Sequence, residues 1–500
     1  MSSTDRDDLM SALFALDAHS HRPLLASESC HGDLRRVASS MQSAERRKQQ
    51  PTFEQSLATL LGSMEAVRPA FTAPGFRNAW VVFAGWVMTA GVHAVTQALV
   101  VTDVARRIHH ERFHRFFSRG AWRPDAVGRL LFLRIVKQLC PYGRVVLALD
   151  DTLVSKKGPE VFGIGSHLDP VRSTKRMLFF SFGHVWVVLA VVVHVPFSPR
   201  KWALPVLMRL YRNKKDCERA GHRYRKKTEL GREMVELVQQ WLAERAFDVV
   251  ADSAYCNDTL TRGLAKRICV IGSIRPDAVL TAAPTPKERK ATGRRRKRGK
   301  LLTKPEKIFK SAKYPWLSTE LYLYGRKSVV SFKTVQAQWY RGAGEQLGRV
   351  VIVRMDHGAI PMRAFFCTDG ERSAEDVLLT YAGRWSIEVC FRDIKQFLGF
   401  GDSCARKQAA VERVAPFVAY AYTILVLWFA DGVWMTQLAA FPIRPWYKHK
   451  RHACFADVLR TAQRVLMRVD VLDPARGYAN LRQLGQHHRQ PAAAASRRAA

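Results

Sequence analysis

The chain has few acidic residues for its size, and its cysteines follow no metal-binding or disulfide pattern. Lys and Arg number 80 against 43 Asp and Glu, which gives a formal net charge of +37 over 500 residues. This excess predicts a polyanionic partner, nucleic acid first and an acidic membrane surface second, but it says nothing about fold. None of the nine cysteines forms a C-x2-C pair, so no zinc centre or disulfide framework is indicated. A reducing cytoplasm is the simplest setting.

Signals for nucleotide binding, export and repeats are also missing. The glycines around 158–165 fit neither G-x4-G-K-[ST] nor G-x-G-x2-G. The N-terminus MSSTDRDDLM carries acids where a secretory signal has basic residues, and no internal repeat is visible. Two apolar runs, 80–101 and 414–430, raise the question of a membrane span. Polar residues inside the first run and the short length of the second favour buried helices, so no membrane partner is expected.

Residues 371–400 are predicted to form one helix with an unusual polar face. At 100° per residue four polar side chains fall within an arc of about 60°. These are Tyr381, Arg384, Glu388 and Lys395. The apolar stripe beside them is formed by Ile387, Phe391, Ile394 and Leu398. A carboxylate between two cations at a core edge suits a metal ligand beside phosphate-holding groups, and a set of ordinary helix ion pairs is the alternative.

Two apolar strands are predicted to end at aspartates. The run RVVLALDDT stops at Asp150 and Asp151, and the run FDVVADSAYCNDTL ends its strand at Asp252. Adjacent side chains on a strand point to opposite faces, so only one of Asp150 and Asp151 can face a site that includes Asp252. Asp248, at the start of the second strand, is interpreted as a turn residue.

Elsewhere the pattern alternates between helical and strand-like stretches. Residues 52–134 and 199–246 are predicted to be mainly helical, and 185–195 to be a buried strand that opens an antiparallel meander with the first strand. The aromatic and basic residues between 109 and 122 suit a nucleic-acid surface and an ordinary helix equally well. Four strands are expected between 321 and 369, after a basic, flexible loop at 284–307.

The four polar residues, with spacing Y-x2-R-x3-E-x6-K, resemble the Tyr-Arg-Glu-Lys signature of insertion-sequence transposases of the DDE type. The resemblance implies a ribonuclease H-like catalytic domain in which Asp151, Asp252 and Glu388 are catalytic and bind two Mg²⁺ ions, with Mn²⁺ able to substitute. The Asp-Thr pair in the resembling motif favours Asp151, with Asp150 the alternative. Tyr381, Arg384 and Lys395 are then expected to contact DNA.

In terms of activity, the resemblance implies a DNA transposase, a metal-dependent polynucleotidyl transferase and endonuclease. Such an enzyme cleaves transposon ends and joins their 3′-hydroxyls to target DNA. The expected partners are double-stranded DNA, both terminal inverted repeats and target, and a second copy of the chain in a homodimer on DNA. A bacterial cytoplasmic, nucleoid-associated location follows. The alternatives are a ribonuclease H-like metal-dependent nuclease and a catalytically inactive DNA-binding relative.

The fold class expected is α/β: a ribonuclease H-like catalytic domain interrupted by a mostly β insertion, with a helical N-terminal DNA-binding region. Trp316 and Trp339 are candidates to stack on a displaced base from the insertion, and core packing is the alternative for both. The predicted division is a loosely structured extension (1–50), the helical region (51–140), the catalytic domain in two parts (141–275 and 371–435), the β-rich insertion with its basic loop (276–370), a basic C-terminal region (436–482) and a disordered tail (483–500).

Overall fold

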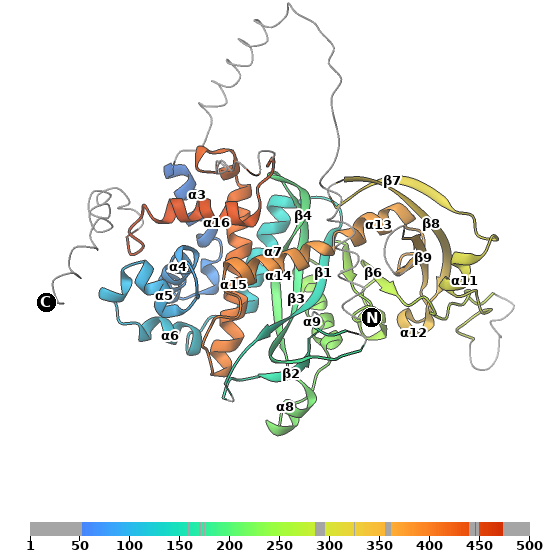
Figure 1. Cartoon of the computed structure of the whole chain (residues 1–500), viewed down its shortest axis with the longest axis horizontal. Helices are drawn as coiled ribbons and strands as arrows, with labels where there is room; N and C mark the ends of the chain where they lie inside the picture. The colour runs from blue at the N-terminus through green and yellow to red at the C-terminus, as the bar shows by residue number, and fades with distance from the viewer. Residues whose placement is uncertain are drawn as a thin grey trace, which may run out of the picture. The chain divides into compact units, whose positions relative to one another are not determined.

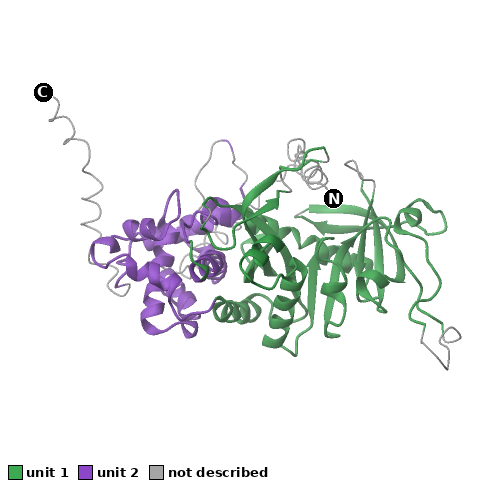
Figure 2. Ribbon diagram, turned by 90° about the horizontal axis from the view of Figure 1, so that it is seen from below, with its two compact units in different colours: residues 1–49, 124–392, 406–408 green, residues 50–123, 393–405, 409–500 purple. Residues whose placement is uncertain are grey.

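A computed structural model describes most of the chain between residues 53 and 473. The described ranges are 53–158, 160–169, 172–174, 176–285, 296–324, 326–355, 362–439, 446 and 450–473. The described residues fall into two compact units, one of residues 124–392 and 406–408 and the other of residues 53–123, 393–405 and 409–473 (Figure 2). The predictions for 1–50 and 483–500 lie outside the described residues, and the finer domain limits stay predictions.

The strands of the first unit form one sheet in the order β2-β3-β1-β5-β6-β10-β9-β8-β7, with β4 beside β3 (Figure 1). Their bounds are β1 Val145–Ser155, β2 Gly165–Leu168, β3 Phe180–Val195, β4 Ser198–Tyr211, β5 Phe247–Ala251, β6 Ile268–Ile274, β7 Leu317–Leu323, β8 Arg326–Gln338, β9 Leu347–Arg354 and β10 Met362–Cys367. β1 and β3 pair antiparallel, as predicted, and β4, which was not predicted as a strand, continues the antiparallel arrangement beside β3. β5 and β6 run parallel to β1. This mixed α/β sheet is consistent with a ribonuclease H-like domain.

Helices cover both faces of this sheet. The helices of the unit are α7 Pro124–Leu139, α8 Lys214–Arg219, α9 Lys227–Trp241, α10 Asp258–Thr261, α11 Pro305–Lys310, α12 Tyr340–Ala343, α13 Ala374–Ala382 and the first part of α14 Trp385–Phe397. Leu149 of β1 packs against Gly231 of α9, where an added Cβ would lie 2.6 Å from its Cδ2. On the opposite face, Gly383 after α13 closely approaches Val192 of β3. The central strands are therefore buried on both sides, as their apolar runs predict.

Residues 198–211 form β4, so the helix predicted for the start of 199–246 is wrong. This run is apolar and buried through its middle, and periodicity alone does not separate a buried strand from a buried helix of that length. Pro205, which has no N–H to donate, lies opposite Ala190, where the β3–β4 register shifts. The irregularity lets a proline reside in an otherwise continuous strand pair.

The single helix predicted for 371–400 is two helices, α13 and α14, separated by Gly383 and Arg384. The connecting turn is tightened by hydrogen bonds from the N–H of Gly383 to the Thr380 carbonyl (3.1 Å) and from that of Arg384 to the Tyr381 carbonyl (2.9 Å). A Cβ at residue 383 would lie 3.1 Å from Cδ of Lys201. The break thus follows from close packing of the turn against neighbouring residues, which no local pattern reveals.

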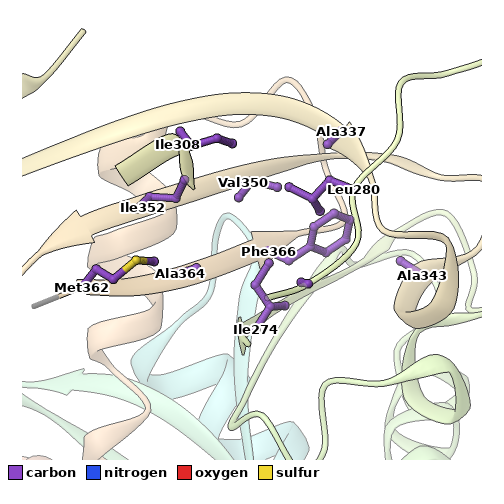
Figure 3. Close-up of a cluster of buried hydrophobic side chains, with 11 residues drawn as sticks. Ile274, Leu280, Ile308, Ala337, Ala343, Val350, Ile352, Met362, Ala364 and Phe366 are labelled. Carbon is purple, nitrogen blue, oxygen red and sulfur yellow. The ribbon is translucent and has the colours of Figure 1, made fainter. Parts of the chain in front are cut away.

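The predicted strands between 321 and 369 are confirmed as β7–β10, and they extend the sheet beyond β6. A cluster of buried apolar side chains fills the space between these strands and α11 (Figure 3). It includes Ile274, Leu280, Ile308, Val350, Ile352, Met362 and Phe366. Trp339 packs edge-on against Phe366 at 5.6 Å, and Trp316 lies 4.6 Å from the ammonium of Lys333. Residues 286–295 of the basic loop lie outside the described residues.

The second unit is helical in its described part. Its elements are α3 Phe53–Glu65, η1 Arg68–Ala70, α4 Ala73–Met88, α5 Val95–Val101, η2 Val104–Arg106, α6 Glu111–Ser118, the end of α14, α15 Gln408–Ala430, η4 Val433–Met435, η5 Gln437–Ala439 and α16 Phe455–Leu466. The apolar run 80–101 is divided between α4 and α5, which meet where an added Cβ at Gly85 would lie 2.3 Å from the Ala98 carbonyl oxygen.

One helix in the described part, α15, is long and apolar enough to cross a membrane, and 83% of its apolar segment is buried inside the protein. Burial to this extent is that of a core helix, as predicted for 414–430. The aromatic residues of the 109–122 stretch are core residues too, because Phe113, Phe116, Phe117 and Trp122 are each at most 4% exposed. The basic residues between them face solvent.

Candidate active site

Strand β1 presents its two consecutive aspartates to opposite faces of the sheet. Asp150 is 5% exposed, and its Oδ2 accepts a hydrogen bond of 2.7 Å from Nη1 of Arg384. Its Oδ1 accepts the N–H of Asp151 at 2.8 Å. The side chain is therefore held from two directions, on the face of the sheet that α13 covers.

Arg384 joins Asp150 to Glu388. Its Nη2 donates to Oε1 of Glu388 at 2.6 Å, one turn further along the chain. The side chains of Arg384 and Glu388 are 12% and 21% exposed, so this arrangement lies at the edge of the core. The turn that interrupts the predicted helix thus directs Arg384 at the strand, and one guanidinium bridges two carboxylates.

Asp252 follows directly on β5, beside the end of the β1 pairing. Leu149 pairs with Ala251, so the next residues, Asp150 and Asp252, are in register and on the same face. Oδ1 of Asp252 accepts the N–H groups of Ala254 (2.9 Å) and Tyr255 (3.1 Å), which fixes the carboxylate at the strand end.

The electrostatics of Asp150 reflect this gathering of acids. Burial raises the pKa of Asp150 to about 7, the Arg384 charge acts against this, and the carboxylates of Asp252, Asp151 and Glu388 raise it further. Burial would lower the pKa of Arg384, but Tyr381 and the surrounding acids raise it well above its ordinary value. The acids therefore repel one another, and a positive charge among them is stabilising.

Asp151 is bound on the other side of β1. Its Oδ2 accepts from Nζ of Lys227, the first residue of α9, and its Oδ1 accepts from the hydroxyl of Tyr255, both at 2.8 Å. Tyr255 is 1% exposed, and burial raises the pKa of its hydroxyl well above its ordinary value. Asp151 thus ties β1 to α9 and to the segment after β5.

The other two residues of the polar set lie on either side of the Arg384–Glu388 pair. Tyr381 lies near the end of α13 with its ring 4.6 Å from that of Phe365, and the Arg384 guanidinium lies 5.9 Å from its ring centre. Burial raises the pKa of the Tyr381 hydroxyl. Lys395 follows Glu388 by seven residues on α14 and is exposed. The structure therefore brings Tyr381, Arg384 and Glu388 together with Asp150, while Lys395 lies two turns along the helix.

Asp248 is not the turn residue that the sequence predicts. It is 1% exposed within β5, and its carboxylate accepts from Nε of Arg144 at 2.6 Å and from Nη2 of Arg372 at 2.8 Å. Arg372 also binds Asp376 in the first turn of α13. This network, with Asp248 and Arg372 buried at its centre, anchors the start of α13 to the sheet. The sequence signal was an aspartate inside an otherwise apolar strand.

The acids near Arg384 are of the type that binds divalent cations. In the described part of the chain, however, no three or more His, Cys, Asp and Glu side chains lie close enough together to hold a metal ion. Asp150, Asp252 and Glu388 offer oxygen ligands only, which Mg²⁺ prefers. The Arg384 guanidinium already serves as a cation between two of them. Burial raises the pKa of Asp150 and the neighbouring carboxylates raise it further, so a cation bound among these acids would be stabilised and the donor set fits metal binding in kind.

Comparison with protein families gives two matches along the chain. The model of a family described as "DDE superfamily endonuclease" matches residues 67–329, more than half of the chain. A second family, described as "Archaeal putative transposase ISC1217", matches residues 344–429. The first match contains Asp150 and Asp252, and the second contains Arg384 and Glu388. A search of curated proteins returned no match.

Proposed function

This chain belongs to the DDE superfamily endonucleases, and from that premise we propose that it is a DNA transposase. It cleaves transposon ends and joins the freed 3′-hydroxyls to target DNA. The observation that carries the proposal is the Asp150–Arg384–Glu388 contact. Asp150 is on β1, in the segment that matches the endonuclease family. Arg384 and Glu388 lie just before and within α14, in the segment that matches a transposase family, so the contact joins the two matched segments.

We assign the metal ligands to Asp150, Asp252 and Glu388, taking the alternative that the sequence left open for β1 in place of Asp151. Asp150 lies on the same face of the sheet as Asp252, and it contacts Arg384, which also binds Glu388. Asp151 instead accepts hydrogen bonds from Lys227 and Tyr255. When bound, two divalent cations such as Mg²⁺ or Mn²⁺ supply a hydroxide at neutral pH and stabilise charge on the attacking and leaving oxygens.

The remaining polar residues hold the DNA. Arg384 is placed to bind a phosphate with the guanidinium edges now used by Asp150 and Glu388, because bidentate recognition of phosphate uses the same geometry as that of carboxylate. Tyr381 contacts the adjacent backbone, and Lys395 binds a phosphate further along α14. Helices α3–α6 form the DNA-binding region and β7–β10 form the insertion.

The partners follow from the reaction. Two transposon ends must be brought together, so the enzyme works as a homodimer on terminal inverted repeats and target DNA. The net charge of +37 supports association with DNA in a nucleoid within the cytoplasm. A nuclease without strand transfer has the same acids, and only the joining step separates it from the transposase.

The test is cleavage of a labelled duplex that carries the DNA flanking the gene, with and without Mg²⁺. Wild type is expected to nick at the repeat boundary in Mg²⁺, and Asp252→Asn and Glu388→Gln are expected to bind the duplex without cutting it. Asp258→Asn is the matched control, because this aspartate is exposed on α10 close to Asp252 in sequence. Nicking without joining would favour the nuclease, and binding without cutting by wild type would favour the inactive relative.

A further inference from the structure

The hairpin of β2 and β3 exposes three large apolar side chains side by side. Leu168 is 48% exposed, Phe180 63% and Phe182 66%, and these three residues are named here the hairpin ridge. Leu168 pairs directly with Phe180, and Phe182 follows two positions along β3, so all three lie on one face. Single exposed apolar residues are ordinary, but a contiguous group indicates a binding surface.

Polar contacts join the end of β2 to the start of β3. The N–H of Asp169 donates to the Phe179 carbonyl at 2.8 Å, and Oδ2 of Asp169 accepts from the Ser181 hydroxyl at 2.9 Å. The Ser173 hydroxyl accepts the N–H of Phe179 at 2.9 Å. These bonds fix the backbone on both sides of Phe180. A ligand that binds Phe180 therefore does not have to order this backbone first.

The hairpin ridge lies on the same face of the sheet as Asp150. Asp150 pairs with Val188 in an unbroken register, and Phe182 is six residues from Val188, an even number. Side chains an even number of positions apart share a face. At about 3.3 Å per residue, Phe182 is about 20 Å along the sheet from the candidate active site.

Basic residues flank the ridge along the chain. The N–H of Lys156 donates to the Phe182 carbonyl, and the Arg172 guanidinium lies 5.3 Å from the ring of Phe179. Lys157 and Arg176 are exposed nearby in sequence. Exposed rings interleaved with cations are what single-stranded nucleic acids bind, because bases stack on the rings while phosphates pair with the cations.

We propose that the hairpin ridge stacks on unpaired bases of the bound DNA at a distance from the cleaved phosphate. This inference rests on the proposed function and identifies a second DNA contact for it. With a rise of about 3.4 Å per nucleotide, a separation of about 20 Å places these bases about six nucleotides from the cleaved phosphate. Phe180 and Phe182 have no polar side-chain atoms, so they discriminate open bases from paired ones and read no sequence.

The experiment compares the binding of two DNAs to the full-length protein in EDTA. One is a fully paired duplex, and the other has the same sequence with a short central bubble of unpaired bases. Wild type is expected to prefer the bubble, and Phe180→Ala/Phe182→Ala is expected to lose roughly five- to a hundredfold in affinity for the bubble only. The salt dependence should be unchanged, because no phosphate contact is removed.

Three variants serve as controls. Tyr142→Ala removes an aromatic ring that is 88% exposed just before β1, and it should leave the preference unchanged. Phe180→Trp/Phe182→Trp retains stacking surfaces and should keep the preference. Arg172→Ala should keep the preference and reduce the salt slope by roughly 0.7 for the unpaired strand.

The proposal would be overturned if the double alanine variant lost affinity equally for both DNAs, or lost no affinity for either. A sedimentation change from dimer to monomer with an intact bubble preference would also overturn it, since the ridge would then join two copies of the chain. Cleavage in Mg²⁺ is measured separately on the flanking-DNA duplex. If wild type cleaves and the double alanine variant binds both DNAs as wild type does, only the role of the hairpin ridge is refuted. If the bubble preference depends on the ridge but wild type does not cleave, only the proposed transposase activity is refuted.

Discussion

Replacing each of the two consecutive aspartates of β1 by asparagine should change stability in opposite directions. Burial and neighbouring acids raise the pKa of Asp150 from 3.8 to about 7. An acid whose pKa is raised in the folded state contributes its full stability below the unfolded value of 3.8 and loses it as pH rises through 7. The Asp150→Asn variant would be free of that loss, because an amide carries no charge at any pH.

The size of the effect follows from the same values. The difference between 3.8 and about 7 corresponds to about 4 kcal/mol at pH 8, and this difference already includes the attraction between Asp150 and Arg384. Asp151→Asn instead loses the charged hydrogen bond from Lys227 and weakens the one from Tyr255, at a cost of about 1–3 kcal/mol. Asp150→Asn should therefore be more stable than wild type at pH 8, and Asp151→Asn less stable.

Thermal unfolding without metal, at pH 8 and at pH 4, measures both effects. For a unit of this size 1 kcal/mol moves the midpoint of thermal unfolding by on the order of 2 °C. At pH 8 the midpoint of Asp150→Asn should therefore be up to about 8 °C above that of wild type, and at pH 4 the two midpoints should coincide. Mg²⁺ should raise the midpoint of wild type and leave that of Asp150→Asn unchanged. A less stable Asp150→Asn at pH 8, or stabilisation of it by Mg²⁺ equal to that of wild type, would refute the assignment of Asp150.

Two other predictions concern buried polar groups away from the metal ligands. Asp248→Ala should destabilise the protein by about 3–5 kcal/mol in urea unfolding, because it leaves Arg144 and Arg372 without their shared carboxylate; a loss under about 1 kcal/mol would contradict an anchoring role. His184 is buried with Nε2 bonded to the Phe162 carbonyl, and burial lowers its pKa to about 4. His184 should therefore contribute a loss of stability of up to about 3 kcal/mol as pH decreases from 6.5 to 4, and the change over that range should be smaller by this amount in His184→Gln than in wild type.

The strands that carry the candidate acids could be predicted because their signals are local. The apolar run before Asp150 and that before Asp252 each end in a carboxylate, and both are buried strands in the structure. The apolar stripe of Ile387 and Ile394 is likewise buried. Patterns of apolar residues identify these elements because burial on the sheet or the core is what selects them.

What the sequence left open or missed depends on tertiary contacts. Strand alternation separates Asp150 from Asp151, but the face that meets Arg384 is decided by the pairing of β1 and by α9, which no motif encodes. The break at Gly383 reflects the proximity of Lys201, nearly two hundred positions earlier in the chain. From sequence alone Asp248 is interpreted as a turn residue because its partner Arg372 is also far away in the sequence, 124 positions later. Long-range ion pairs and close approaches leave no periodic trace.

The register of β1 has a consequence for how this gene tolerates insertions and deletions. β1 is paired on one side with β3 along ten positions and on the other with β5, so its alignment relative to both neighbours is fixed. Deleting one codon inside β1 would exchange the faces of every residue that follows. The acid that meets Arg384 would then be the one now bound to Lys227, and the apolar residues of the strand would change sides with it. Length variation is therefore expected in the connections around the sheet, while the codon count between Val145 and Asp151 stays constant in functional copies.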